Sequence, residues 1–189
     1  MSAKDNLSKA IALVFPVIDM PISGDLTRHE DSCYDCRHLR KDLEDYRNKD
    51  VTNETTRLAH QELSHFSAKG LRWLLPHYLR FCLTTEAEFT RMETEFFIFH
   101  FSPSAEFQTD VSEQLRGLDR DQINCLIHFF NQIRTPIIRG CACGALAYRA
   151  VAALRELARK GRQNGLNSGS RTENTTERAG ANLGRCPID

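Results

Sequence analysis

The 189-residue chain carries 25 basic and 25 acidic residues, but these charges are unevenly distributed. Residues 1–138 have a net charge of −5, and residues 139–189 have a net charge of +5. The acidic body argues against nucleic-acid binding there, since such a domain usually shows a basic face. No run of about 18 apolar residues predicts a transmembrane helix.

The seven cysteines are an odd number and are irregularly spaced. Near the N-terminus, the apolar run Ala10–Phe15 is shorter than the core of a secretory signal. We therefore expect a cytoplasmic protein with reduced thiols rather than a disulfide-bonded scaffold.

The first part of the chain predicts short helices separated by loops. Residues 3–15 show helical periodicity, whereas residues 16–31 contain prolines and a glycine and predict a loop. Ser32 is expected to cap a helix over 33–46, because its hydroxyl can accept a bond from the first turn.

The densest apolar stretch, residues 63–83, predicts the central core helix. Ser67 is its expected N-cap, and Pro76 removes one backbone donor in its middle. Trp73, the single tryptophan, lies on its apolar side. The rest of the fold is expected to pack around this helix.

Two further helices follow. Thr85 is expected to cap a helix over 86–100, although the aromatic run at its end also has strand propensity. Asp119 and Gln122 form a capping-box pattern before a helix over 120–134.

The composition changes after residue 135. Residues 136–163 predict an appended Ala/Arg-rich helix, and residues 164–189 are polar and predict a disordered tail. The expected fold is therefore mainly α: a compact multi-helix single domain over 1–135, with a basic C-terminal helix and a disordered end.

The pattern of His29, Cys33, Cys36 and His38 is the clearest chemical signal. A Cys-x-x-Cys turn can present two thiolates to one zinc ion, and a histidine can supply a third ligand. A complete site would need a fourth donor from elsewhere. The available donors are His60, His65, Cys141 and Cys143.

Two alternatives to a zinc site remain open. Capping by Ser32 would place Cys33 at a helix N-terminus, where the helix dipole lowers a thiol pKa and favours redox chemistry. The strands and βαβ pattern of thioredoxin-like proteins are absent from the sequence, however. The two cysteines can also be buried thiols without a chemical role.

A second group, Arg72, Trp73, His77 and Tyr78, lies within the central helix. Arg72 can stack on an aromatic ring, so this group is a candidate interaction surface. The alternative is that these side chains simply belong to the core helix and balance charges around it.

Four features together resemble DUF6714, a family of small bacterial proteins with no assigned activity. The resemblance covers about residues 10–133 and implies a helical fold and no assigned activity. Its features are the loop from Pro21 to Gly24, the His29/Cys33/Cys36 cluster, the run Phe66-Ser67-x-x-Gly70-x-Arg72-x-x-Leu75-Pro76-x-Tyr78-Leu79, and Leu118-Asp119-x-x-Gln122 followed by Phe129-Phe130.

These observations predict a non-catalytic cytoplasmic interaction module that binds a macromolecular partner, expected to be a protein. The alternative is a small zinc- or thiol-dependent protein that uses Cys33 and Cys36. No cofactor other than zinc is indicated by the sequence.

Overall fold

The computed structural model describes residues 2–47, 49–137 and 143–168. Within these ranges the chain is helical, as predicted, and its only extended pairing is one isolated antiparallel bridge between Thr27 and Phe66. In chain order the elements are α1 (Ala3–Val14), α2 (Ser23–Leu26), α3 (Tyr34–Glu44), α4 (Asn53–Ala59), the 3₁₀ helix η1 (His60–His65), α5 (Ala68–Phe81), α6 (Thr85–Thr90), α7 (Met92–His100), the 3₁₀ helix η2 (Ala105–Phe107), α8 (Gln108–Leu115), α9 (Arg120–Ile137) and α10 (Cys143–Ser168).

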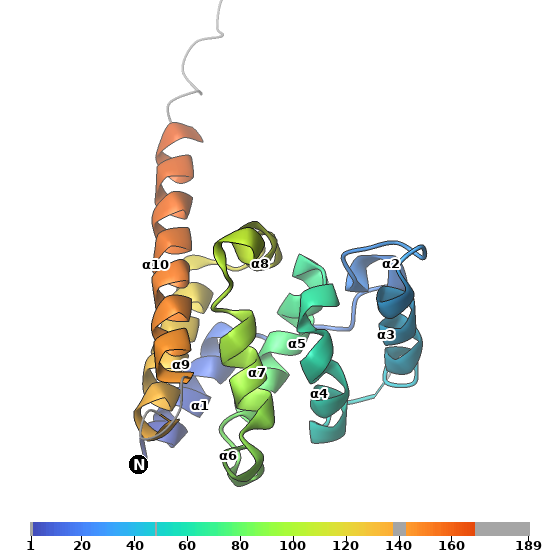
Figure 1. Cartoon of the computed structure of the whole chain (residues 1–189), viewed down its shortest axis with the longest axis horizontal. Coiled ribbons are helices and arrows are strands. Elements are labelled where there is room, and N and C mark those ends of the chain that lie inside the picture. The colour runs from blue at the N-terminus through green and yellow to red at the C-terminus, as the bar shows by residue number, and fades with distance from the viewer. Residues whose placement is uncertain (1, 48, 138–142, 169–189) are drawn as a thin grey trace, which may run out of the picture.

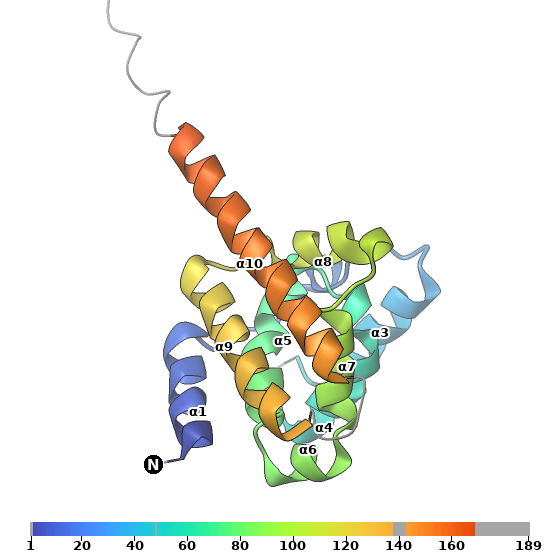
Figure 2. The same ribbon diagram turned by 60° about the vertical axis from the view of Figure 1, so that its left-hand side comes forward.

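The helices are arranged around α5 and α7. Figure 1 shows α9 and α10 at one end of the molecule and α2 and α3 at the other, with α4, α5 and α7 between them. Figure 2 shows α10 crossing α9 and α7, which are also the helices that it contacts.

The central helix α5 begins where the sequence predicts. The Ser67 hydroxyl caps it by accepting a hydrogen bond from the Gly70 backbone N–H at 3.0 Å. The helix continues through Pro76. Trp73 is 2% exposed and Tyr78 is fully buried, so the predicted role of this helix at the centre of the core is confirmed.

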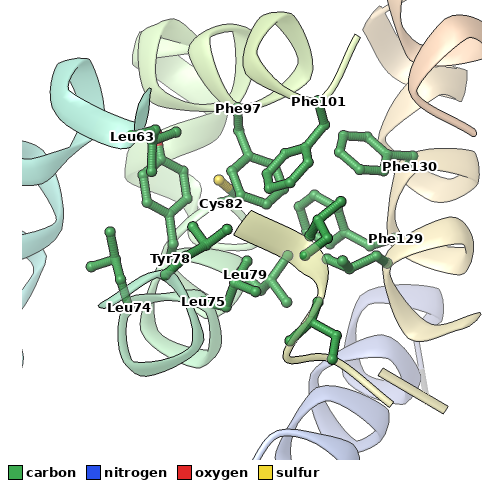
Figure 3. Packing of buried hydrophobic residues seen from close by; sticks show 14 of the residues in the cluster. Leu63, Leu74, Leu75, Tyr78, Leu79, Cys82, Phe97, Phe101, Phe129 and Phe130 are labelled. Atoms are coloured by element: carbon green, nitrogen blue, oxygen red, sulfur yellow. The ribbon is translucent and has the colours of Figure 1, made fainter. Parts of the chain in front are cut away.

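Aromatic rings join α5, α7 and α9 in one core (Figure 3). The ring of Phe97 lies 4.9 Å from that of Tyr78, 4.7 Å from Phe101, 5.7 Å from Phe129 and 5.5 Å from Phe130, measured between centroids. Stacked and edge-to-face pairs of this kind add to the free energy gained by burying the rings. The aromatic run that had some strand propensity is therefore helical, because its inward rings pack against two other helices.

The prediction of one helix over 86–100 is wrong. Arg91 has φ 58°, a left-handed conformation that ends α6 and begins α7. The N-cap of α6 is Thr84 rather than Thr85, and its side chain accepts a hydrogen bond from the backbone of Ala87.

Tertiary contacts of Glu93 account for this break. Its side chain is 1% exposed and accepts hydrogen bonds from Thr90 Oγ1 at 2.8 Å and from Arg57 Nε at 3.3 Å. Its backbone oxygen accepts a bond from the buried Tyr78 hydroxyl at 2.8 Å. A buried carboxylate must be paired, and these partners hold Glu93 in the first turn of α7, directly after the break at Arg91.

The capping box of α9 is confirmed. The Gln122 N–H donates to Asp119 Oδ1 at 2.8 Å, and the Asp119 N–H donates to Gln122 Oε1 at 3.1 Å. The helix continues through Pro136 to Ile137, beyond the predicted end at residue 134.

Helix α10 packs against the body more closely than an appended helix would. Four of its residues join the same hydrophobic core as the earlier helices: Ala147, Ala150, Val151 and Leu154. No described helix is both long and apolar enough to cross a membrane. Of the tail predicted to be disordered, residues 164–168 form the end of α10, and residues 169–189 lie outside the described part of the chain.

The loop after α2 lies directly against the loop before α5. The Arg28 N–H donates to the His65 oxygen at 2.8 Å, and the Ser67 N–H donates to the Leu26 oxygen at 3.0 Å. Gly70 allows this approach, because a Cβ atom at that position would lie only 2.0 Å from the Leu26 oxygen.

We predict that Gly70→Ala destabilises the protein by about 1–3 kcal/mol, because the added methyl group displaces the Leu26 backbone. Urea unfolding monitored by circular dichroism measures this difference. The matched control is Gly24→Ala, where a Cβ atom meets nothing within 4 Å and little change is expected. Equal stability of the two variants would contradict the steric argument.

Candidate metal-binding site

The candidate metal-binding site lies at the start of α3. Cys33 is the N-cap of this helix and makes no side-chain cap hydrogen bond, so the prediction that Ser32 caps it is wrong. Cys36 lies in the first turn on the buried side, and its side chain has no exposed surface. The Cys-x-x-Cys turn therefore places one half-buried thiol and one buried thiol at the helix N-terminus.

A buried arginine fixes the backbone that carries the histidine. Arg40, on the inner side of α3, donates to the His29 oxygen at 3.0 Å and to the Thr27 hydroxyl, and it forms an ion pair with Asp31. The Arg40 side chain is 10% exposed and its bond to Thr27 is buried, whereas its partner Asp31 is 91% exposed. These bonds hold the segment before α3 against the helix.

The structure brings three of the four predicted ligands together. His29, Cys33 and Cys36 each offer a ligand atom, and these atoms all lie within 4.8 Å of one another. His29 Nδ1 and Cys36 Sγ lie 3.4 Å apart. His29 is exposed, so the cluster is open to solvent on one side.

The two thiols lie in different electrostatic environments. The backbone N–H of Cys36, with its side chain, hydrogen-bonds to Cys33 and lowers the pKa of the Cys33 thiol. Burial raises the pKa of the Cys36 thiol, and the neighbouring Cys33 adds to this effect. Cys33 is therefore the readier of the two to form a thiolate, the form that binds metals and attacks electrophiles.

His38, the fourth predicted ligand, lies apart from this cluster. Its ring packs on Tyr34 with 4.2 Å between centroids, and it is not one of the three residues whose ligand atoms converge. His65 instead lies beside two carboxylates, with Nδ1 2.8 Å from Glu62 and Nε2 3.7 Å from Asp35.

Of the remaining proposed donors, His60 is the one whose side chain the structure describes, and it does not belong to the cluster. His60 is buried and its Nδ1 hydrogen-bonds to the Arg57 oxygen. Cys141 lies outside the described residues, and Cys143 is described only as the first residue of α10.

The predicted interaction group of α5 does not form one surface. Trp73 and Tyr78 are buried in the core, whereas Arg72 is exposed and His77 is half-buried. Burial lowers the pKa of His77, and the nearby Arg80 adds to the lowering.

A buried polar network centred on Gln114 was not predicted from the sequence. Its Nε2 donates to the Leu63 oxygen at 2.8 Å and to the Phe66 oxygen at 2.7 Å, and its Oε1 lies 3.0 Å from His100 Nε2. A glutamine in a short polar helix gives no signal of this role. The network holds the segment between η1 and α5, on which the loop carrying His29 rests.

The structure predicts a pH-dependent stability. Burial lowers the pKa of His100 from 6.5 to about 4, so protonation favours the unfolded chain. Neutral His100 therefore stabilises the folded state. This stabilisation is fully present above pH 6.5 and is lost as the pH falls from 6.5 toward 4. The loss between pH 7 and pH 5 should be on the order of 1–2 kcal/mol.

Urea unfolding at the two pH values, compared between wild type and His100→Gln, isolates this contribution. The variant should show a smaller loss, whereas His128→Gln, at an exposed position, should behave as wild type. An unchanged pH dependence in His100→Gln would contradict the assignment.

A comparison with protein families gives a match over the central part of the chain. The model of a family described as "Family of unknown function (DUF6714)" matches residues 27–136, which is more than half of the chain. No curated protein and no solved structure matches. The matched range contains the whole His29/Cys33/Cys36 cluster and Gly70, and it begins one residue after Leu26, the residue that Gly70 approaches.

Proposed function

Since the chain belongs to the DUF6714 family, whose function is unknown, we propose a function from its own residues. The protein holds a zinc ion with His29, Cys33 and Cys36. The observation that carries this proposal is the convergence of the three ligand atoms within 4.8 Å.

The donor set suits zinc in particular. Zinc binds thiolate sulfur and imidazole nitrogen at about 2.0–2.3 Å in a tetrahedral arrangement, and sites of mixed cysteine and histidine ligands are common. Calcium and magnesium prefer oxygen donors, which do not belong to this cluster. Three protein ligands leave a fourth position on the exposed side of His29, where water or a partner group can bind.

A zinc ion here would join two parts of the fold. His29 belongs to the loop that contacts η1 and α5, whereas Cys33 and Cys36 belong to the first turn of α3. The ion would link that loop to the helix beside the ion pair and hydrogen bonds of Arg40. The proposed role of the metal is therefore to stabilise the end of the molecule that contains α2 and α3.

We expect purified protein to contain one equivalent of zinc per chain, measured by mass spectrometry of the metal content. Cys33→Ser and Cys36→Ser should each lose most of it, because a serine hydroxyl binds zinc far more weakly than a thiolate. Removal of zinc with a chelator should lower the melting temperature of the wild type.

His38→Gln is the matched control, since His38 lies on the same helix but packs on Tyr34. It should retain zinc and its melting temperature. A wild-type protein without metal, or serine variants that keep their zinc, would contradict the proposal.

We also propose a second function, that of a non-catalytic cytoplasmic interaction module with a protein partner. Its support is the high exposure of individual large apolar side chains, which a protein partner could cover. Phe89, in α6, is 91% exposed and Leu13, in α1, is 85% exposed. Neither residue belongs to the predicted group in α5, half of which is buried.

Affinity capture with the full chain tests this second function. Phe89→Ser should lose a partner that wild type retains, because it removes an exposed ring without disturbing the core. Glu54→Ser, at an exposed position of α4, is the control and should retain the same partner. Identical captured proteins for wild type and Phe89→Ser would contradict a role for this surface.

A further inference from the structure

A cavity of about 400 Å³ lies between η1, α7 and α8, away from the cysteine cluster. Its walls combine aromatic side chains with a few polar groups, and α10 contributes Arg149 to its edge. This size and this mixture of surfaces are typical of small-molecule sites, which are mostly apolar with a small number of polar groups that fix orientation.

Three aromatic side chains contribute to the apolar part of the cavity, together with Leu63, Pro103 and Val111. Phe96, Phe99 and Phe107 all line it, and they are 38%, 67% and 52% exposed. Exposed rings that gather around one cavity differ from single apolar residues scattered over a surface, which need no explanation. The faces of such rings bind flat apolar groups by stacking or edge-to-face contact.

Two guanidinium groups line the same cavity. Arg28 forms an ion pair with Asp110 at 2.8 Å, and this pairing leaves other N–H donors of the guanidinium free. Arg149 has no hydrogen bond or ion pair with any residue in the part of the chain that the structure describes. Two arginines against one aspartate give this group of three residues a net positive charge.

The floor of the cavity is fixed by hydrogen bonds. His100 and Gln114 line it, and their side chains bond to each other at 3.0 Å. Gln114 is held in turn by the Leu63 and Phe66 carbonyls, so neither group needs to move to form the site. A preformed cavity binds its ligand without the loss of side-chain entropy that ordering would require.

We propose that this cavity binds a small aromatic carboxylate. The planar guanidinium group of Arg149 matches the carboxylate in shape and charge and can form two parallel hydrogen bonds to it. The rings of Phe96, Phe99 and Phe107 contact the aromatic body. The site shares no ligand residue with the zinc cluster, so it does not depend on the proposed function.

Isothermal titration calorimetry of the full chain with 2-naphthoate tests this site. The neutral 2-naphthamide, of nearly the same shape, should bind at least about tenfold more weakly, because it cannot pair with a guanidinium charge. Arg149→Met, which keeps an apolar stem of similar length, should weaken naphthoate binding and abolish its preference over the amide. Phe99→Ala should weaken both ligands.

Arg155→Met is the matched control, an exposed arginine of α10 that does not line the cavity. It should bind naphthoate as wild type does, and circular dichroism should show that every variant is folded. Absence of naphthoate binding, equal affinity for the amide, or binding unaffected by both cavity variants would overturn the proposal.

Discussion

The close contact between the loop after α2 and the loop before α5 fixes the position of both candidate sites. Two backbone hydrogen bonds join residues 26–28 to residues 65–67, and the missing side chain of Gly70 allows the Leu26 carbonyl to approach α5. Arg28, on the paired segment, reaches the aromatic cavity, whereas its neighbour His29 reaches the two cysteines. One short non-helical segment therefore supplies one polar side chain to each site.

In this fold, buried polar side chains pair backbone carbonyls that lie outside regular helices. Segments outside regular helices carry backbone carbonyls that must be paired when they are buried. Gln114 pairs those of Leu63 and Phe66, and Arg40 pairs that of His29. These two side chains hold irregular backbone in fixed positions, which is what a metal cluster and a preformed cavity both require.

The two sites differ in their chemistry. The cysteine cluster is small and open at His29, and its donors are a nitrogen and two sulfurs that suit a soft or borderline metal ion. The cavity is larger, lined by three phenylalanines, and positively charged at Arg28 and Arg149. A protein with both features can hold a metal for stability at one end while it presents a ligand site near α10.

The sequence by itself determined the helical class, the buried centre around Trp73 and the caps at Ser67 and Asp119, because periodicity and capping depend on neighbours within a few residues. It also identified His29, Cys33 and Cys36, whose spacing is local. Only the tertiary structure decided the break at Arg91, the exclusion of His38 from the cluster, the packing of α10 and the aromatic cavity. Each of these depends on groups distant in the chain, such as Arg57 with Glu93 or Gln114 with Phe66, whose proximity no local pattern encodes.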